Sequence, residues 1–519
     1  MEKTIEKEAS VKNGVTRMVL SLIIIAIEVI FIILQFTKLS QHAVWIEAMM
    51  RILALFLVLL IYSRPGTSST KMPWIILILL APILGLGLYL IVGLNGGTKV
   101  MRRRYKLVDD ELLPLLKTEG AASRALAGES DRWATVSNYI ARNSGYPLYN
   151  NTDIVYYDDA AKGLEAQKAA LRRAEKFIFM EYHAIEDRES WHGLQEILEE
   201  RVRAGVEVRV FYDDMGSIGF ITTDFVKRLE AVGIKCRVFN PFLPGLSLFL
   251  NNRDHRKITV IDGVVGFTGG YNIANEYFNI THPYGQWKDT GVRLTGDAVR
   301  SLTATFLENW NAVDRDNKRY DPDFSKYLPK VNYTASERAY VQPYADSPLD
   351  GERVGEEVYI SLVNKANRYC WFVTPYLILT EEMIHALGLA AKRGVDVRVI
   401  TPGIPDKKLV YDVTRSYYHM LTRNGVRVYE WTPGFCHCKM CVADDEAATC
   451  GTINLDYRSL YHHFENGCLY MKCQAVLDTK ADFEQIMLEA TEVTEKYNTG
   501  RDQFLKFKQL LLRLFAPLL

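Results

Sequence analysis

The sequence predicts an α/β protein: two pseudo-twofold-related α/β/α halves with mixed sheets, preceded by N-terminal transmembrane helices. Three observations lead to this fold class. A short motif of chemically active residue types occurs twice, the segments around it repeat in the same order, and strongly apolar segments are concentrated in the first hundred residues. At 519 residues, the chain is also longer than one ordinary domain.

Residues 1–100 are predicted to be a membrane region with two or three transmembrane helices. Met18–Phe36 and Pro73–Val92 are apolar and long enough to span a hydrocarbon core of about 30 Å. A third span could run from Ala43 to Tyr62, although it would carry Glu47 and Arg51. A cleavable signal peptide fits poorly, because the first apolar run begins late and further apolar runs follow it.

The basic residues beside these segments do not decide the topology. With three spans, six Lys or Arg residues would lie on each side, so the positive-inside rule gives a tie. The apolar spans predict a multi-pass protein of the cell membrane, and the MRRRYK run that begins at Met101 favours a cytoplasmic catalytic region. The same run is equally typical of a plain stop-transfer anchor and of a segment that binds anionic lipid. Residues 101–136, charged and helical in pattern, are predicted to form a connector.

The rest of the chain alternates between strand and helix patterns. The short apolar run Phe177–Tyr182 predicts a buried strand, and Trp191–Ala204, with its helical spacing and a following Gly205, predicts a helix with a glycine C-cap. Tyr369–Ile378 and Glu381–Arg393 show the same pattern further along. Alternating strands and helices favour a sheet that is covered by helices.

These elements belong to a duplicated unit. RAGVEVRVFYD, which starts at Arg203, corresponds to KRGVDVRVITP, which starts at Lys392, and LEAVGIKCRVF corresponds to LTRNGVRVYEW. The matching glycines Gly205 and Gly394 are 189 residues apart. We therefore expect a first half at 137–330 and a second half at 331–519, related by a pseudo-twofold axis.

Each half carries one copy of the motif His-x-Lys-x4-Asp. In both copies a small-residue pair and an asparagine follow at the same distance. On a strand, residues two apart share a face, so the spacing is expected to pair an imidazole with an ammonium group. The first copy comprises His255, Lys257, Asp262 and Asn272, and the second comprises His437, Lys439, Asp444, Thr452 and Asn454.

Such residues suit the chemistry of a phosphodiester. This group is anionic and reacts very slowly unaided, so an enzyme must neutralise its oxygens, supply a nucleophile and protonate the leaving alkoxide. Two histidines, two lysines and two asparagines that converge across a twofold axis could do all three. The reaction would need no metal ion and no cofactor.

The doubled motif resembles the phospholipase D superfamily and, within it, the bacterial cardiolipin synthases. The resemblance covers roughly Ser137 to the C-terminus and rests also on YNIANEY followed by WKDTGVRLTG, on NLDYRSL, on the N-terminal apolar spans and on the closing LLLRLFAPLL. It implies a phosphatidyl transfer between two phosphatidylglycerol molecules that gives cardiolipin and glycerol through a covalent phosphohistidine. It also implies lipid partners and a bilayer location.

The resemblance assigns roles to the residues. It implies that His255 is the nucleophile and that His437 is the general acid and base, with the opposite assignment left open by the pseudo-symmetry. It also implies that Glu465 orients His255 and that Asp289 orients His437. The phosphate oxygens would be held by the remaining polar residues of the motifs: Lys257, Lys439, Asn272, Asn454 and Thr452. Asp262 and Asp444 complete the two catalytic motifs, although a bracing role in the local turn is favoured for both.

Several alternatives stay open. The acceptor could be water or another alcohol, which would make the chain a hydrolase or a different phosphatidyltransferase, or the fold could be a non-catalytic scaffold. Cys436, Cys438 and Cys441 around the second motif could be zinc ligands, although small buried side chains in a reducing cytosol are favoured. A net charge of zero argues against nucleic acid as a partner. Whether the chain forms an oligomer is not decided.

Two further segments could contact lipid. The apolar loop Pro241–His255 could admit acyl chains or could pack under the sheet. The tail Phe504–Leu519 has apolar residues at helical spacing, which suits an interfacial helix and equally a helix docked on the protein.

Overall fold

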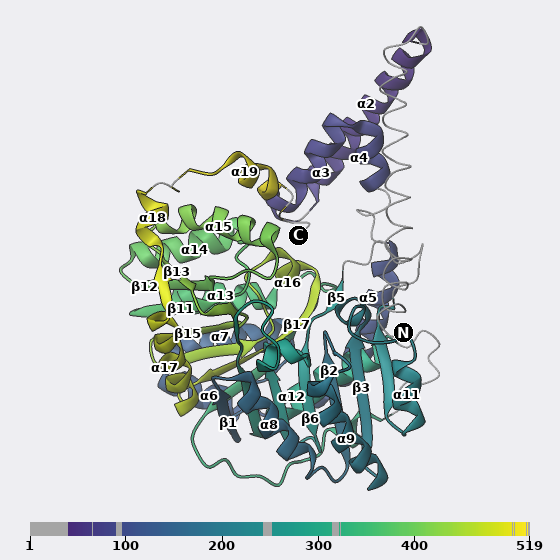
Figure 1. Cartoon of the computed structure of the whole chain (residues 1–519), viewed down its shortest axis with the longest axis vertical. Coiled ribbons are helices and arrows are strands. Elements are labelled where there is room, and N and C mark those ends of the chain that lie inside the picture. The colour runs from purple at the N-terminus through teal and green to yellow at the C-terminus, as the bar shows by residue number, and fades with distance from the viewer. Residues whose placement is uncertain are drawn as a thin grey trace. The chain divides into compact units, whose positions relative to one another are not determined.

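The computed structural model describes residues 40–64, 66–89, 96–241, 252–313, 321, 323–500, 502, 504–514 and 516. The chain divides into two compact units (Figure 1). One unit contains the N-terminal helices, and the other, Met101–Pro241 with Asn251–Gln509, contains both sheets. The predicted span Met18–Phe36 and the loop 242–251 lie outside the described residues.

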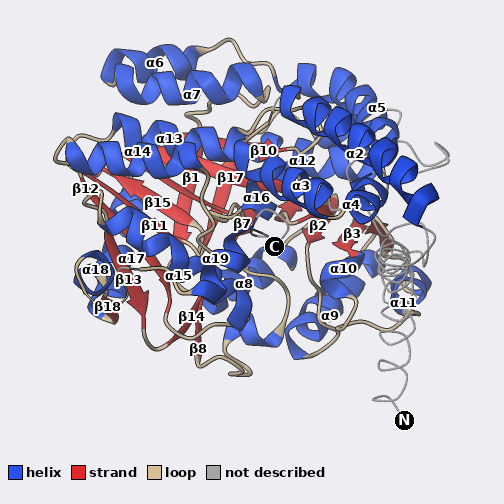
Figure 2. Cartoon of the chain, turned by 90° about the horizontal axis from the view of Figure 1, so that it is seen from above, coloured by secondary structure: helices blue, strands red, loops and turns tan. Residues whose placement is uncertain are grey.

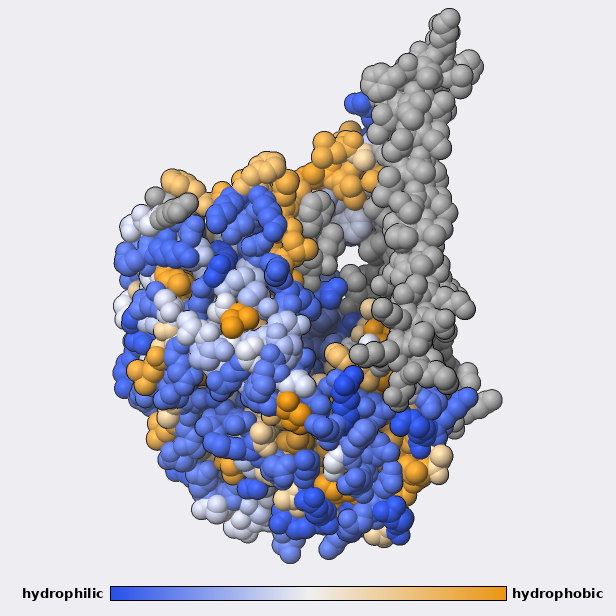
Figure 3. All heavy atoms as spheres, viewed as in Figure 1, coloured by the Kyte–Doolittle hydropathy of each residue, from blue (hydrophilic) through white to orange (hydrophobic). Residues whose placement is uncertain are grey.

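The N-terminal unit contains α2 (Ser40–Ser63), α3 (Ser68–Leu80) and α4 (Pro82–Leu88). The predicted span Pro73–Val92 is therefore interrupted, because Pro82 has no amide hydrogen and disfavours a helical conformation at Ala81 before it. No helix in the described part of the chain has both the length and the apolar character that crossing a membrane requires. Hydrophobic side chains gather on the surface over α3, where Leu80 is 80% exposed (Figure 3).

The first half of the larger unit forms a seven-stranded mixed sheet. The pairs β2–β3 and β3–β4 are parallel, and the remaining pairs are antiparallel. Every residue of β2 is buried, as expected for a short apolar run in the middle of a sheet. In spatial order the strands are β1 (Thr152–Tyr157), β9 (Gly291–Gly296), β7 (Val265–Gly269), β6 (Lys257–Ile261), β2 (Phe177–Tyr182), β3 (Glu207–Asp213) and β4 (Lys235–Phe239).

The second half repeats this order. Its three parallel strands correspond to β2, β3 and β4, and four of its antiparallel strands occupy the places of β1, β9, β7 and β6. One further antiparallel strand at the edge has no counterpart among the described strands of the first sheet. The predicted duplication and mixed α/β fold are thus confirmed. The strands are β10 (Tyr340–Asp346), β17 (His463–Met471), β16 (Ala447–Gly451), β15 (Met440–Ala443), β11 (Tyr369–Val373), β12 (Asp396–Pro402), β13 (Arg427–Trp431) and β18 (Ala490–Glu492).

Helices cover both sides of the strands. In Figure 2, α13 and α14 lie on one side, and α8, α9 and α15 lie on the other. The longer helices of this unit are α5 (Gly96–Leu112), α6 (Ala121–Glu129), α7 (Asp131–Asn143), α8 (Ala160–Leu171), α9 (Glu189–Arg203), α12 (Val299–Ala312), α13 (Val354–Lys365), α14 (Glu381–Lys392), α15 (Lys408–Thr422) and α17 (Gln474–Leu488). The shorter ones are α10 (Asp214–Ser217), α11 (Phe225–Ala231), α16 (Tyr457–Tyr461), α18 (Thr494–Asn498), η2 (Leu113–Leu116), η3 (Asn275–Phe278) and η4 (Phe324–Tyr327).

The predicted helix ends follow from local chemistry. Gly205 and Gly394, just beyond α9 and α14, have φ of 89° and 94°, a left-handed conformation that other residues adopt at a cost. At the start of α14, the hydroxyl of Thr380 accepts a hydrogen bond from the amide of Met383. Each parallel strand pair is thus connected by a helix with defined ends.

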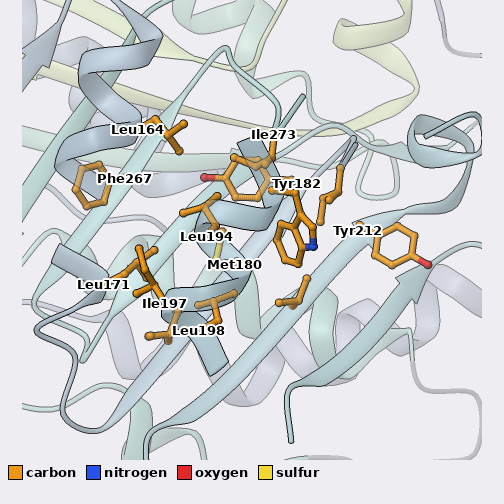
Figure 4. Close-up of a cluster of buried hydrophobic side chains, with 14 of the residues drawn as sticks. Leu164, Leu171, Met180, Tyr182, Leu194, Ile197, Leu198, Tyr212, Phe267 and Ile273 are labelled. Atoms are coloured by element: carbon orange, nitrogen blue, oxygen red, sulfur yellow. The ribbon is translucent and has the colours of Figure 1, made fainter. Parts of the chain in front are cut away.

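A continuous core joins the first sheet to its helices (Figure 4). Leu164 from α8 and Leu194 from α9 pack with Met180 of β2 and Phe267 of β7, and all four are at least 96% buried. Burying one such side chain contributes about 1.5–3 kcal/mol. This rigid layer supports the strands that end at the functional residues.

The C-terminal tail begins at an exposed segment. It forms α19 (Phe507–Leu514), and Phe504 and Phe507 are 77% and 76% exposed. Lys508 forms an ion pair with Asp412 of α15 at 2.5 Å. The start of the tail is therefore fixed to the protein by charge, while its aromatic side chains face outward.

Candidate active site

His255 is positioned by an exchange of strands between the halves. The two-residue strand β5 (Arg253–Asp254) comes from the first half but pairs with β17 of the second half. The amide of His255 continues this pairing by donating to the carbonyl of Phe464 at 2.9 Å. The imidazole Nδ1 then lies 2.9 and 3.0 Å from the two carboxylate oxygens of Glu465, on the same strand β17.

The second half shows the corresponding arrangement, with the roles of the two halves exchanged. The strand β14 (Gly434–Cys436) pairs with β8 (Gln286–Lys288) of the first half. The amide of His437 donates to the carbonyl of Lys288 at 2.7 Å, and its Nδ1 lies 2.7 Å from a carboxylate oxygen of Asp289. Each histidine therefore meets the acid of the opposite half, as the sequence indicates.

The structure corrects one expectation about this region. The histidines were expected on a strand with their lysines, but His255 lies between β5 and β6, and His437 lies between β14 and β15. Each histidine stands where the chain leaves the strand shared with the other half and enters its own sheet. The direction of each imidazole is therefore set by the strand pairing between the halves and not by the face of a strand that the histidine shares with its lysine.

Both lysine ammonium groups turn back toward their histidines. Lys257 Nζ donates to the carbonyl oxygen of His255 at 2.5 Å. Lys439 Nζ lies 2.7 and 2.9 Å from the ring nitrogens of His437 and also donates to its carbonyl oxygen. Both lysines are 99% buried. The site therefore concentrates cationic groups beside two imidazoles.

Burial and positive charge determine the protonation of these groups. Burial and the neighbouring charges of Lys257, His463, Lys439 and His437 hold the pKa of His255 well below its ordinary value. The pKa of His437 is lowered by burial and by Lys439 and Lys257. Both imidazoles are thus neutral near pH 7 and are available as a nucleophile or a base.

The two cations and the second acid are shifted as well. Burial lowers the pKa of Lys257 to about 7, with Lys439 adding repulsion. Burial raises the pKa of Asp289 to about 7, against the opposing effect of Lys439. An anionic ligand would favour the charged forms of the lysines, since it would supply the negative charge that they lack.

Glu465 has further hydrogen-bond donors besides His255. The hydroxyls of Thr452 and Ser459 both donate to its carboxylate, which is fully buried. The predicted phosphate contact of Thr452 is therefore corrected: its hydroxyl is buried and points to Glu465, so it holds the acid in place.

The two asparagines of the motifs differ in their surroundings. Asn272 uses its carboxamide inside the protein, accepting from the amide of Ala184 at 3.1 Å and donating to the hydroxyl of Tyr277 at 2.8 Å. Its predicted phosphate contact is limited to the remaining amide hydrogen. The side-chain oxygen of Asn454 is buried and has no hydrogen-bond partner within the described structure.

The motif aspartates lie away from the histidines, at the far ends of β6 and β15. Asp262 accepts hydrogen bonds from the amides of Glu175, Lys176 and Phe177, and Asp444 accepts from those of Asn367, Arg368 and Tyr369. A direct catalytic role for these two aspartates is therefore corrected: their carboxylates tie a turn to the start of β2 or β11, which is the bracing role favoured from the sequence.

Two histidines beside His255 were missed by the sequence analysis. The ring centroid of His183 lies 5.0 Å from that of His255, and the ring of His463 lies 5.4 Å from it. The Nδ1 of His183 is 2.6 Å from the carbonyl oxygen of Asp254. Only His463 had a signal in the sequence, since it stands two residues before Glu465 on a strand and so shares its face.

The cysteines around His437 do not form the zinc site considered as an alternative. Within the described residues, the one group of three or more ligand-type side chains at metal-binding distance is His255, His463 and Glu465, which includes no cysteine. The thiols near this motif are buried and form no disulfide bonds: they belong to Cys436, Cys438, Cys441 and Cys450. They act as small packing residues around β14 to β16.

The assembled site can act on an anionic ester. It holds two neutral imidazoles, each hydrogen-bonded through Nδ1 to a carboxylate, and two ammonium groups that can bind phosphoryl oxygens. A hydrogen bond from Nδ1 to a carboxylate leaves Nε2 for attack or proton transfer, and Nε2 of His437 lies 2.9 Å from Lys439 Nζ, with which it can exchange a proton.

Comparison with known proteins agrees with this geometry. The family described as cardiolipin synthase, PLD-like domain matches residues 359–487, and the phospholipase D-nuclease N-terminal family matches residues 51–93. A cardiolipin synthase of Halalkalibacterium halodurans is 30% identical over 480 residues, covering 91% of this chain and 93% of that protein. A cardiolipin synthase of Staphylococcus aureus is 29% identical, covering 95% of this chain and the whole of that protein.

One relative and one solved structure extend the comparison. An uncharacterized protein of Streptococcus mutans is 41% identical over 460 residues and covers 89% of this chain. The crystal structure of a phosphatidylserine synthase from Haemophilus influenzae superposes with a TM-score of 0.57 at 15% identity, covering 75% of this chain and 98% of that one. This last likeness shows the shared fold.

Proposed function

Because the chain belongs to the cardiolipin synthase family, we propose that it is a phosphatidyltransferase that joins two phosphatidylglycerol molecules into cardiolipin and releases glycerol. The observation that carries this proposal is the pair of imidazoles, His255 and His437, each bound through Nδ1 to the acid of the other half. The relatives that cover nine-tenths of the chain carry the name of this activity.

The first step transfers the phosphatidyl group to the enzyme. Nε2 of His255 attacks phosphorus, the bond from phosphorus to the terminal glycerol oxygen breaks, and His437 passes to that oxygen a proton that it takes from Lys439. Lys439 supports this assignment, because an ammonium group within 3 Å of both ring nitrogens of His437 can supply protons to that ring. Lys257, Lys439 and Asn454 bind the phosphoryl oxygens.

The second step returns the phosphatidyl group to an alcohol. His437 removes the proton from a hydroxyl of a second phosphatidylglycerol and returns it to Lys439, and the hydroxyl oxygen displaces Nε2 of His255. The two phosphodiester exchanges nearly balance in energy, so no nucleotide is consumed. Water in place of the second lipid would give phosphatidic acid, which is the product of the alternative hydrolase.

The N-terminal unit is proposed to hold the enzyme at the cell membrane as a multi-pass region, with the catalytic unit on the cytoplasmic side. The support is the exposed apolar surface of α2, where Trp45, Ile52 and Tyr62 are at least 70% exposed. Extraction of the membrane fraction with alkaline carbonate tests it: release of the full chain into the supernatant would contradict this placement.

The proposed activity is tested by incubating the purified full chain with labelled phosphatidylglycerol and separating the products. Cardiolipin and free glycerol in equal amounts are expected, and an acid-labile phosphohistidine should be trapped on the wild type but not on His255→Ala. His192→Ala, which removes a histidine with a 57% exposed side chain, is the matched control and should keep full activity. Phosphatidic acid as the sole product would reject the transferase.

A further inference from the structure

The proposed nucleophile, His255, also belongs to a cluster of side chains that could bind a metal ion. His255, His463 and Glu465 each offer one ligand atom, and these atoms lie within 4.8 Å of one another. We propose that these three residues bind a zinc ion, and that zinc inhibits the enzyme reversibly by occupying the nucleophile. This inhibition rests on the proposed function, whereas the binding of zinc does not.

The distances suit a tetrahedral ion. Ligand atoms about 2.0–2.1 Å from zinc are about 3.3 Å apart in a tetrahedron. The distance from His255 Nδ1 to Glu465 Oε1 is 2.9 Å, and that from His463 Nδ1 to the same oxygen is 3.7 Å. Shifts of a few tenths of an ångström at these two pairs would open room for the ion.

A second observation points independently to a ligand. Nδ1 of His463 is buried and has no hydrogen-bond partner among the described residues, and 89% of this side chain is withdrawn from solvent. Buried polar nitrogens nearly always have a partner, so one that lacks it is poised to accept a cation or a proton. The strand β17 directs this nitrogen to the same side as Glu465, two residues further on.

The ligand types select the metal. Two imidazoles and one carboxylate form a common zinc set that leaves a fourth position open, whereas magnesium and calcium prefer oxygen ligands only. The carboxylate of Glu465 is already held by the hydroxyls of Thr452 and Ser459, so its orientation is fixed before an ion arrives. The nearby Lys257 and Lys439 repel a cation and thereby keep the affinity moderate.

Inhibition follows from what the ion would replace. Zinc on Nδ1 of His255 takes the place of the hydrogen bond to Glu465, and the neutral imidazole then carries its proton on Nε2. This nitrogen therefore has no lone pair with which to attack phosphorus. A chelator should restore the activity, because no covalent bond is changed.

Metal binding is tested directly on the untagged full chain in detergent. Cobalt(II) is added as a spectroscopic substitute for zinc, and zinc affinity is then measured by competition with a coloured chelator. The wild type should give the intense visible absorption of tetrahedral cobalt and bind one zinc ion, and magnesium should not compete. His463→Asn should lose the absorption and at least tenfold in zinc affinity, while the control His183→Asn should keep both.

Activity is measured in parallel, each variant relative to its own rate without metal. Zinc should inhibit the wild type and His183→Asn, a chelator should reverse this, and His463→Asn should need at least tenfold more zinc. Equal zinc affinity in the wild type and in His463→Asn would overturn the proposal, as would unchanged activity at a zinc concentration that saturates the site. A chain that binds cobalt as expected but forms no cardiolipin would reject the proposed function and keep the metal site.

Discussion

Glu465 is the residue on which the orientation of the proposed nucleophile depends. Its buried carboxylate lies at hydrogen-bond distance from Nδ1 of His255 and accepts from the hydroxyls of Thr452 and Ser459. Glu465→Gln keeps the shape but places an amide NH2 opposite at least one donor, and it removes the charge that would stabilise an imidazolium. We expect kcat to fall by about 10²–10⁴-fold with a much smaller change in KM.

The measurement is steady-state kinetics on mixed micelles of phosphatidylglycerol. The melting temperature of the variant should be compared with that of Ser459→Ala, which removes one donor and leaves the charge. If Glu465→Gln retained more than a tenth of the wild-type kcat, the carboxylate would not orient the nucleophile.

The partners of individual residues could be predicted only where spacing carried the information. The doubled motif indicated His255, His437, Glu465 and Asp289, because relatives share that spacing. The hydroxyl of Thr452 was predicted to bind phosphate. Nothing in the sequence shows that it donates its hydrogen bond to Glu465 on the neighbouring strand instead. The pairing of β16 with β17 inside the second half brings this hydroxyl beside Glu465, and such a contact leaves no periodic signal in the sequence.

Tight turns at the ends of β6 and β15 depend on their aspartates. Asp262 has φ of 55° and accepts three backbone hydrogen bonds from the segment that starts β2. Asp262→Ala should lower the free energy of unfolding by about 3 kcal/mol, since it removes these bonds and strains a positive φ. The kcat per folded molecule should stay unchanged.

Urea denaturation and kinetics on the folded fraction check this expectation. Asp262→Asn is the matched variant, because asparagine tolerates positive φ and keeps one acceptor, so it should lose less stability than alanine. A tenfold fall in kcat with unchanged stability would instead place Asp262 in the reaction.

The end of β10 should make stability depend on pH. Burial raises the pKa of Asp346 to about 8 from an ordinary value of 3.8, and its carboxyl accepts from the amide of Gly355 at 2.8 Å. Between these two values the folded state keeps a proton that the unfolded state has lost. Stability due to this group therefore falls as pH rises, by about 1.4 kcal/mol per unit, and levels off above the folded pKa.

Asp346→Asn removes this dependence while keeping an acceptor for Gly355. Between pH 6 and pH 7.5 the wild type should lose about 2 kcal/mol more than the variant, as measured by urea denaturation at both pH values. Parallel pH profiles for the two proteins would show that the carboxyl is ionised in the fold.

Elements were predicted well where burial or capping is local. Phe177–Tyr182 became β2 with the same bounds, and the helix before Gly394 became α14, because a short apolar run and a C-cap glycine act within a few residues. The strands β5 and β14 were not predicted, since two or three residues that pair with another half carry no pattern of their own. Pro82 interrupts the predicted span Pro73–Val92 between α3 and α4.

Over the whole molecule, one chain supplies both halves of a single site. His255→Ala and His437→Ala chains expressed together should therefore form no more cardiolipin than either alone. Lipid extraction and chromatography of the cells give the result, and expression of the wild type at the same level is the control. Restored synthesis would show that subunits exchange halves to rebuild one intact site.

The exchanged strands also bear on the order in which the protein is made. Glu465, the acid that holds His255, follows it by 210 residues, so a ribosome must nearly finish the chain before the first histidine has its partner. A fragment released early thus carries a complete first motif without the means to use it. Such a shortened product is therefore not expected to act on lipids.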